Sequence, residues 1–286
     1  GRCDIVDKNK IQEDCGNNAV LYSLFVFYHD ILWIIRRKNG MKKILVINPN
    51  TSEKMTADVR ATVNRIKRAD VEVETVHPAY GPESLESAYD TAIATNAMID
   101  MLTGREAEYD GVLIACFGDP GHDALKEMLD GAVVGIAESA IAMALMLGNK
   151  YSILAAGERA VPLMENMVNS YGLKERLASV ECLGMSVTAV EEQKEEAIEK
   201  LTQAAGRAAG KGADVLILGC AGMTTLKAAV EERTGMVILD PVETGYAMLE
   251  AMVCRGLKVS HSGLYAKLPE KIYIGGLRTE TRNDFC

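Results

Sequence analysis

The chain lacks several features that would place it in a common functional class. It has no excess of basic residues, because 31 Lys and Arg stand against 40 Asp and Glu and give a net charge of −9. An acidic balance argues against nucleic-acid binding, which needs a basic face. No GxGxxG or GxxxxGK segment follows an apolar run, so nucleotide binding has little support. What is left is a globular protein of ordinary composition, 48% hydrophobic and 25% charged.

Cysteine pairs spaced for metal or disulfide bonds are also missing. The seven cysteines include no CxxC pair and no zinc-type cluster, and their odd number and wide spacing do not suit a disulfide framework. We therefore expect free thiols in a reducing compartment, which favours a cytoplasmic protein without a bound metal ion.

A long uninterrupted hydrophobic run is absent as well. The apolar stretch AVLYSLFVFYHDILWII has 17 residues, and His29 and Asp30 interrupt it. The residues before it do not resemble a signal peptide. We expect residues 1–40 to be an appended segment ahead of Met41, with a membrane anchor or an extra helix as the alternatives. The polar residues 277–286 are expected to form a tail.

From Met41 onward, strands alternate with helices in a pattern that occurs twice. The predicted strands are KKILVI, VEVETV, GVLIACF and AVVGIA, followed by YSILAAG, ASVECLG, DVLILGC and MVILD. Matching strands lie roughly 105 residues apart, which indicates an internal duplication of the pattern. Regular alternation of strand and helix is typical of parallel sheets with helices on both faces.

This pattern predicts an α/β fold of two similar lobes related by pseudo-twofold symmetry. Each lobe is a four-stranded parallel sheet flanked by helices. Lobe 1 is predicted to span residues 41–138 and lobe 2 residues 139–240. A C-terminal helix over residues 242–256 is expected to pack back on lobe 1.

Capping residues predict where three of the helices begin. Ser52 is expected to cap the first helix, and Ser84 to start the second. Asp119 is expected to cap the third, with Pro120 as its first residue. On this reading His122 lies in the first turn of the third helix, where we expect it to point into solvent, with assistance to Cys116 as the alternative.

Two cysteines occupy the same place in the two repeats. Cys116 and Cys220 each follow the third predicted strand of a lobe. Ligands of open α/β sheets bind beyond the carboxyl ends of the strands, so facing lobes would present the two thiols to opposite sides of one ligand. Each thiol also precedes a predicted helix, whose positive N-terminal end would favour the thiolate. Glycines that follow each cysteine leave backbone N–H groups free to approach an oxyanion.

Two acid–base groups on opposite faces of one carbon are what racemisation without a cofactor requires. One thiolate removes a proton, backbone donors hold the enolate, and the opposite thiol returns a proton to the other face. Two readings compete with this one. A cysteine at a strand end is often only a small buried hydrophobic residue. In the second competing interpretation, the chain is a two-lobed protein that binds a small molecule and catalyses no reaction.

Five segments resemble the aspartate/glutamate/hydantoin racemase superfamily. They are INPNTS (47–52), GPESLES (81–87), ACFGDPG (115–121), GIAESA (135–140) and GCAGM (219–223), and the resemblance runs from about Met41 to Gly276. The likeness is greatest to the hydantoin and allantoin racemase branch. The segment GLKVSHSGLYAKLPEKIY near the end of this chain also looks like that branch. The resemblance implies that Cys116 and Cys220 are catalytic, with no metal and no organic cofactor. The substrate-binding segments of the family map onto Asn48, Asn50, Glu83, Ser84, Phe117, Gly118, Ala221 and Gly222.

The sequence therefore predicts an isomerase, a racemase that acts on a cyclic ureide such as a 5-substituted hydantoin or allantoin. An amino-acid racemase of the aspartate or glutamate type and a maleate-isomerase-like or decarboxylase-like enzyme are the alternatives. Ala155 and Ala156 stand where many members carry hydroxyl residues, and Pro241 follows Asp240 where a glycine is expected. The expected partner is a small-molecule substrate, with no nucleic acid and no membrane, and the protein is expected to form a homo-oligomer.

Overall fold

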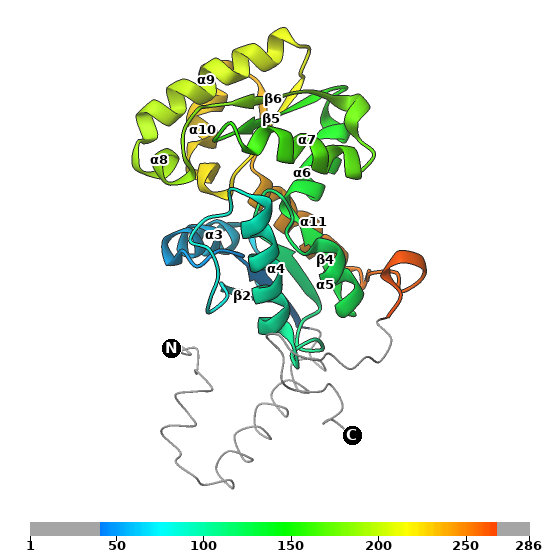
Figure 1. The fold of residues 1–286 in the computed structure, drawn as a ribbon. Helices are drawn as coiled ribbons and strands as arrows, with labels where there is room; N and C mark the ends of the chain where they lie inside the picture. The colour runs from blue at the N-terminus through cyan, green and yellow to red at the C-terminus, as the bar shows by residue number, and fades with distance from the viewer. Residues whose placement is uncertain (1–40, 268–286) are drawn as a thin grey trace, which may run out of the picture. The chain divides into compact units, whose positions relative to one another are not determined.

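The computed structural model describes residues 41–267 of the chain, which form two separate sheets with helices around them (Figure 1). The expectations for residues 1–40 and 277–286 lie outside the described residues. No helix between residues 41 and 267 is long and apolar enough to cross a bilayer.

Each of the two sheets has four strands in the same order. Lobe 1 contains β1 (Lys42–Ile47), β2 (Val71–Val76), β3 (Gly111–Ile114) and β4 (Ala132–Gly135), arranged β2-β1-β3-β4. Lobe 2 contains β5 (Tyr151–Ala155), β6 (Leu177–Cys182), β7 (Val215–Leu218) and β8 (Val237–Leu239), arranged β6-β5-β7-β8. The central pairs β1–β3 and β5–β7 are both parallel. The predicted fold class is confirmed.

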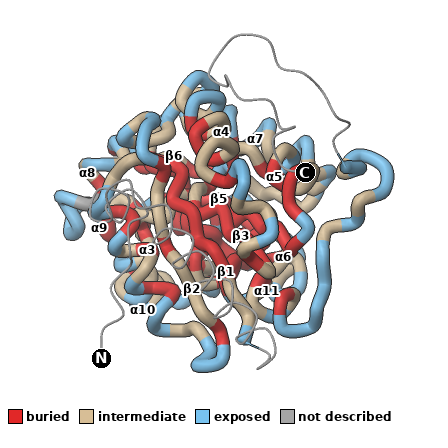
Figure 2. The backbone as a smooth tube through the Cα atoms, turned by 90° about the horizontal axis from the view of Figure 1, so that it is seen from below, coloured by how far each residue is buried: buried red, intermediate tan, exposed pale blue. Residues whose placement is uncertain are grey.

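The sheets are buried and the helices cover them. Every residue of β3, β4, β5 and β7 is buried, as expected of parallel strands with helices on both faces (Figure 2). The helices are α3 (Glu53–Ile66), α4 (Ala88–Leu102), α5 (His122–Met128), α6 (Ile136–Leu147), α7 (Ala160–Ser170), α8 (Val187–Glu192), α9 (Lys194–Gly210), α10 (Lys227–Thr234) and α11 (Pro241–Cys254). Three short 3₁₀ segments join them: η1 (Lys174–Arg176), η2 (Ala221–Leu226) and η3 (Gly263–Tyr265).

The first predicted helix start is confirmed and the second is wrong. Ser52 caps α3, and its hydroxyl accepts the amide of Met55 at 3.2 Å. Helix α4 begins at Ala88 and is capped by Ser87 rather than started by Ser84. The hydroxyl of Ser87 accepts the amide of Asp90 at 3.1 Å, which satisfies a free donor of the first turn.

The third predicted helix start is also wrong, because Asp119 caps a different helix. Helix α5 begins at His122, and its cap is Gly121, which has the left-handed φ of 70°. The carboxylate of Asp119 instead accepts the amides of Ala137 at 3.0 Å and Glu138 at 2.8 Å, in the first turn of α6.

Gly135 explains why Asp119 reaches α6. Gly135 occupies the cap position of α6 and has no side chain with which to bond the helix. A Cβ atom on Gly135 would lie 2.1 Å from Cγ of Asp119, so the absent side chain is what makes room for the carboxylate. The cap of α6 therefore comes from the loop after β3.

One hydrophobic core connects the two lobes. It contains strand side chains of lobe 1, such as Leu113, and of lobe 2, such as Ile153, together with residues of α6 and α11. Helix α11 follows β8 of lobe 2 and packs on α6, α3, β3 and β4 (Figure 1). A Cβ atom on Gly245 would lie 3.0 Å from Leu113 Cδ1 and from Ser139 Oγ, so this glycine permits the close approach of α11. The lobes are thus joined by packing as well as by the chain.

Candidate active site

Cys116 and Cys220 leave the two sheets at matching positions. The residue before each cysteine donates its amide to the central strand of its sheet: Ala115 to Ile47 O at 2.8 Å, and Gly219 to Leu154 O at 2.9 Å. Each cysteine is therefore the next residue beyond the carboxyl end of an equivalent strand. This is where open α/β sheets bind their ligands.

Cys116 lies in a poorly solvated position. Burial raises the pKa of its thiol well above the ordinary range, and the negative charges of Cys220 and Asp119 raise it further. Among the described residues, no hydrogen-bond donor reaches Cys116 Sγ. The expectation that a helix N-terminus lowers this pKa is wrong, because α5 begins only at His122.

Cys220 has a different environment. It caps the 3₁₀ segment η2, and the amide of Gly222 donates to Cys220 Sγ at 3.4 Å. A backbone N–H directed at sulfur favours the charged form of a thiol. The predicted binding residue Gly222 thus acts on the cysteine itself. Ala221 is half-buried at the start of η2.

Asn48 and Asn50 organise the loop that follows β1. Both side chains are buried. Asn48 Nδ2 donates to Asn50 Oδ1 at 2.7 Å and to Thr56 Oγ1 at 3.0 Å, while Asn50 Nδ2 contacts Met55 Sδ at 3.2 Å. These hydrogen bonds hold the loop that follows β1, which lies beside the end of β3 because Ala115 pairs with Ile47.

Glu83 and Ser84 lie on the neighbouring loop. The amide of Thr51 donates to Pro82 O at 3.0 Å, which ties this loop to the one after β1. Glu83 is exposed, and Ser84 Oγ donates to Glu86 Oε1 at 3.1 Å. The structure thus brings the predicted segments 47–52 and 81–87 together at the carboxyl edge of the lobe 1 sheet.

The turn after Cys116 offers backbone donors. Phe117 packs its ring into the shared core, and Gly118 is exposed. Neither of their amide N–H groups has an acceptor among the described residues, so both are available to a substrate oxygen. Ala155 and Ala156, after β5, are buried and present no polar group.

Sequence reasoning placed His122 in solvent, and this is wrong. His122 is only 6% exposed, and its Nε2 lies 2.7 Å from Glu138 Oε2. The first turn of α5 faces the first turn of α6, because Asp119 holds the two together. Burial would raise the pKa of Glu138, but His122 and Lys126 outweigh it and hold that pKa below its ordinary range.

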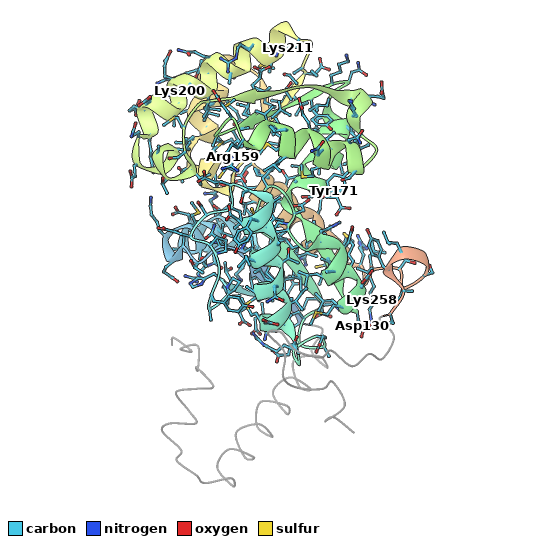
Figure 3. The ribbon with its side chains drawn as sticks, viewed as in Figure 1. Asp130, Arg159, Tyr171, Lys200, Lys211 and Lys258 are labelled. Atoms are coloured by element: carbon cyan, nitrogen blue, oxygen red, sulfur yellow. The ribbon has the colours of Figure 1, made fainter. Side chains whose placement is uncertain are left out.

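Tyr171, which sequence reasoning missed, connects lobe 2 to the turn after Cys116. It ends α7 in lobe 2, and its hydroxyl donates to Asp119 Oδ2 at 2.7 Å. Figure 3 labels Tyr171 on the side of lobe 2 that faces lobe 1. No local motif distinguishes this tyrosine, since its partner lies 52 residues away.

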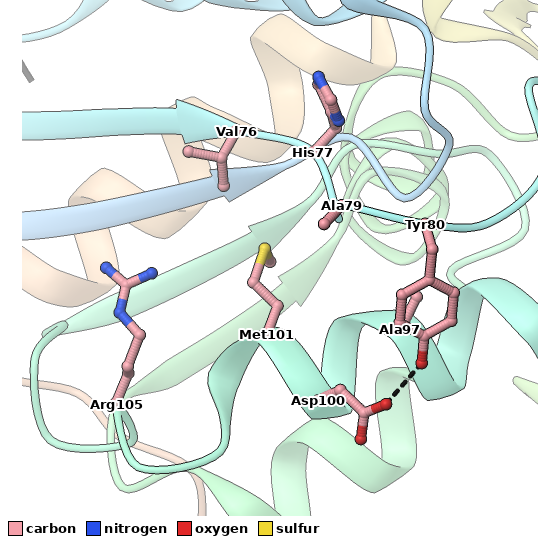
Figure 4. Close-up of a pocket in the computed structure, with 8 residues that line it drawn as sticks. All are labelled: Val76, His77, Ala79, Tyr80, Ala97, Asp100, Met101 and Arg105. Carbon is pink, nitrogen blue, oxygen red and sulfur yellow. Dashed lines mark hydrogen bonds between the residues drawn. The ribbon is translucent and has the colours of Figure 1, made fainter. Parts of the chain in front are cut away.

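A separate pocket of about 380 Å³ lies between the end of β2 and α4, and neither cysteine lines it (Figure 4). Its polar groups are already paired: the hydroxyl of Tyr80 donates to Asp100 Oδ2 at 2.5 Å, and His77 Nε2 lies 3.0 Å from Glu53 Oε2. We therefore place the candidate active site at the two thiols and not at this pocket.

The two sheets and the two cysteines define a duplicated α/β protein in which each repeat brings one thiol to the carboxyl edge of its sheet. The sequence model of the Asp/Glu/Hydantoin racemase family matches residues 44–249. The chain therefore belongs to this family. The hydantoin racemase of Pseudomonas sp. strain NS671 is 36% identical over 243 residues, which cover 84% of this chain and 98% of that protein.

Two solved structures share the fold. The allantoin racemase from Klebsiella pneumoniae superposes with a TM-score of 0.77 at 34% identity, covering 82% of this chain and 97% of that one. The allantoin racemase from Pseudomonas fluorescens gives a TM-score of 0.78 at 33% identity, covering 82% and 100%. The predicted family and the predicted isomerase class are both confirmed.

Proposed function

We propose that this protein racemises a cyclic ureide, a 5-substituted hydantoin or allantoin, by proton transfer through Cys116 and Cys220. The observation that carries the proposal is the equivalent place of the two cysteines. In each lobe the cysteine directly follows the last residue that hydrogen-bonds to the neighbouring central strand. The relatives named hydantoin racemase and allantoin racemase support the class of substrate.

The two thiols act in turn as base and acid. For the enantiomer whose α-proton faces Cys220, the Cys220 thiolate removes that proton and becomes a thiol. The electron pair moves into the ring as an enolate, and the Cys116 thiol gives its proton to the opposite face of the carbon. The opposite direction uses the same groups with their roles exchanged. Proton exchange with water then restores the starting charge state.

The enolate oxygen needs hydrogen-bond donors. The amides of Phe117 and Gly118 supply them from the turn that carries Cys116. A well-placed donor at a developing oxyanion contributes about 3–4 kcal/mol of transition-state stabilisation. These amides also sit on the same rigid turn as one of the acid–base groups, which fixes their geometry relative to it.

An uncharged ureide suits the predicted binding residues better than an amino acid does. The α-carbon of a hydantoin lies beside an amide carbonyl, so its enolate forms more easily than that of an amino acid, whose carboxylate resists further negative charge. The predicted binding residues include no Lys or Arg, and the charged member is the acidic Glu83. A dicarboxylate substrate would find no counter-charge among them.

Polarimetry of enantiopure substrates tests this function. We expect a 5-substituted hydantoin or allantoin to lose optical rotation at neutral pH in the presence of EDTA, much faster than aspartate or glutamate. Cys116→Ala and Cys220→Ala should each abolish the reaction, since each enantiomer needs both groups. Cys254→Ala, which removes an exposed thiol on α11, is the matched control and should leave the rate unchanged.

Two results would contradict parts of this proposal. If aspartate or glutamate racemises faster than every ureide, the substrate class is wrong. If either alanine variant at Cys116 or Cys220 stays active, the two-thiol mechanism is wrong. The homo-oligomer and the cytoplasmic location stay predictions from the sequence.

A further inference from the structure

The turn that carries Cys116 is built around a strained and buried aspartate. Asp119 has a φ of 45°, which is uncommon for a residue other than glycine. Its amide donates to Cys116 O at 3.1 Å, and its carbonyl accepts the amide of His122 at 3.2 Å. The position of Asp119 therefore sets the path of the chain between Cys116 and α5.

The carboxylate of Asp119 is held from three directions. It is 5% exposed and accepts the amides of Ala137 and Glu138 from α6. The third donor is the hydroxyl of Tyr171, at 2.7 Å, and it comes from lobe 2. Burial raises the pKa of Asp119 above its ordinary value, and these three donors only partly offset that rise. A buried carboxyl group that loses one of its hydrogen-bond partners is left poorly satisfied, so the Tyr171 hydroxyl matters to this turn.

The ring of Tyr171 is held as well as its hydroxyl. It packs edge-on against the ring of His122, with centroids 6.3 Å apart and an interplanar angle of 69°. His122 is fixed in turn by Glu138, to which Lys126 Nζ also bonds at 3.1 Å. Tyr171 thus contacts lobe 1 at the first turns of α5 and α6, through His122 and Asp119.

We propose that Tyr171 and Asp119 are a positioning pair, which holds lobe 2 against the turn of Cys116 and so sets the direction of its thiol for proton transfer. The inference rests on the proposed function of Cys116. Neither residue touches the substrate in this account. The pair acts by keeping the two thiols aligned across one carbon, and small displacements of an acid–base group reduce the rate strongly.

Tyr171→Phe tests the pair because it removes the hydroxyl and keeps the ring. Tyr151→Phe is the matched control: it removes the hydroxyl of another tyrosine in lobe 2, which donates to Leu173 O at 3.4 Å within the same lobe. In Tyr171→Phe we expect kcat to fall about tenfold with KM changed less than about threefold, because alignment is lost and binding is not. Tyr151→Phe should change neither.

Hydrogen–deuterium exchange of the full-length protein gives a readout that needs no substrate. Tyr171→Phe should speed exchange about fivefold or more in the peptide that spans residues 116–138 of lobe 1, although the substitution lies in lobe 2. Tyr151→Phe should leave that peptide unchanged. If the wild-type protein racemises no ureide, the proposed function fails while the exchange data still decide whether the pair holds the turn.

A double-mutant cycle with Asp119→Asn completes the test. If the residues act as a pair, the variant with both substitutions loses no more activity than Asp119→Asn alone. If the losses of activity from the two substitutions multiply in the double variant, the proposed pair is wrong. It is also wrong if Tyr171→Phe has the same kcat and the same exchange rates as Tyr151→Phe. Should Asp119→Asn fail to fold, the comparison of the two tyrosine variants decides the matter by itself.

Discussion

At the residue scale, the two thiols are equivalent in the chain and unlike in their surroundings. Cys220 receives a backbone amide at its sulfur, whereas the half-buried Cys116 lies near the negative charge of Asp119. The raised pKa of Cys116 favours its neutral thiol in the free protein. A neutral Cys116 suits the direction in which Cys220 is the base and Cys116 the acid, and the opposite direction needs the proton to move from Cys116 to Cys220 first.

The raised pKa of Cys116 predicts how stability depends on pH. An unfolded thiol ionises above about pH 8.5, while the folded Cys116 keeps its proton, so the folded state binds more protons there and loses stability as pH rises. Relative to Cys116→Ala, the wild-type protein should lose about 1 kcal/mol of unfolding free energy between pH 8 and 9.5. Urea unfolding of both proteins at the two pH values measures this. A constant difference would mean that the folded thiol titrates normally.

How far the sequence predicts the site differs from residue to residue. The places of Cys116 and Cys220 follow from the repeat, because each ends a recognisable apolar strand. The roles of Asp119 and His122 do not, since their partners lie on α6 and are brought near only by the packing of two helices. Tyr171 has no signal in the sequence at all, because its partner belongs to the other lobe.

At the element scale, helix caps show where local rules hold and where tertiary structure replaces them. Ser52 caps the helix that follows it, as its place in the sequence predicts. Helix α6 has Gly135 at its cap position, which carries no side chain. Asp119, in the loop after β3, caps the helix instead. The strands were predictable because their apolar runs are short and bounded by turn residues, whereas a cap donated from a distant loop leaves no local pattern.

Two glycines should respond in opposite ways to replacement by alanine. Gly135→Ala places a Cβ atom against the Asp119 carboxylate, so we expect a loss of at least about 2 kcal/mol of unfolding free energy. Gly206→Ala, in the exposed face of α9 with nothing within 4 Å, should stabilise the protein by about 0.5–1 kcal/mol. Thermal or urea unfolding compares them. Equal effects of the two substitutions would show that Asp119 moves aside without loss.

At the scale of the whole described unit, residues 43–267, the duplication accounts for the equivalent places of the two thiols. The two sheets repeat the same strand order, and α6 and α11 join them through a common core. Each repeat supplies one cysteine at its carboxyl edge, and the hydrogen bond from Tyr171 to Asp119 joins the two lobes beside one of these edges. In the proposed mechanism the two chemically similar thiols approach the substrate carbon from different sides.

The central claim is that each thiol serves one face of the substrate carbon. The measurement that tests it most directly is exchange of the α-proton in D2O, followed by NMR for each enantiomer of a 5-substituted hydantoin with Cys116→Ser and Cys220→Ser. A serine hydroxyl is too weak a base near neutral pH, so only the remaining cysteine can remove a proton in each variant. We predict that the two variants exchange opposite enantiomers. Exchange of the same enantiomer by both variants, or equal exchange of both enantiomers by either, would contradict the account.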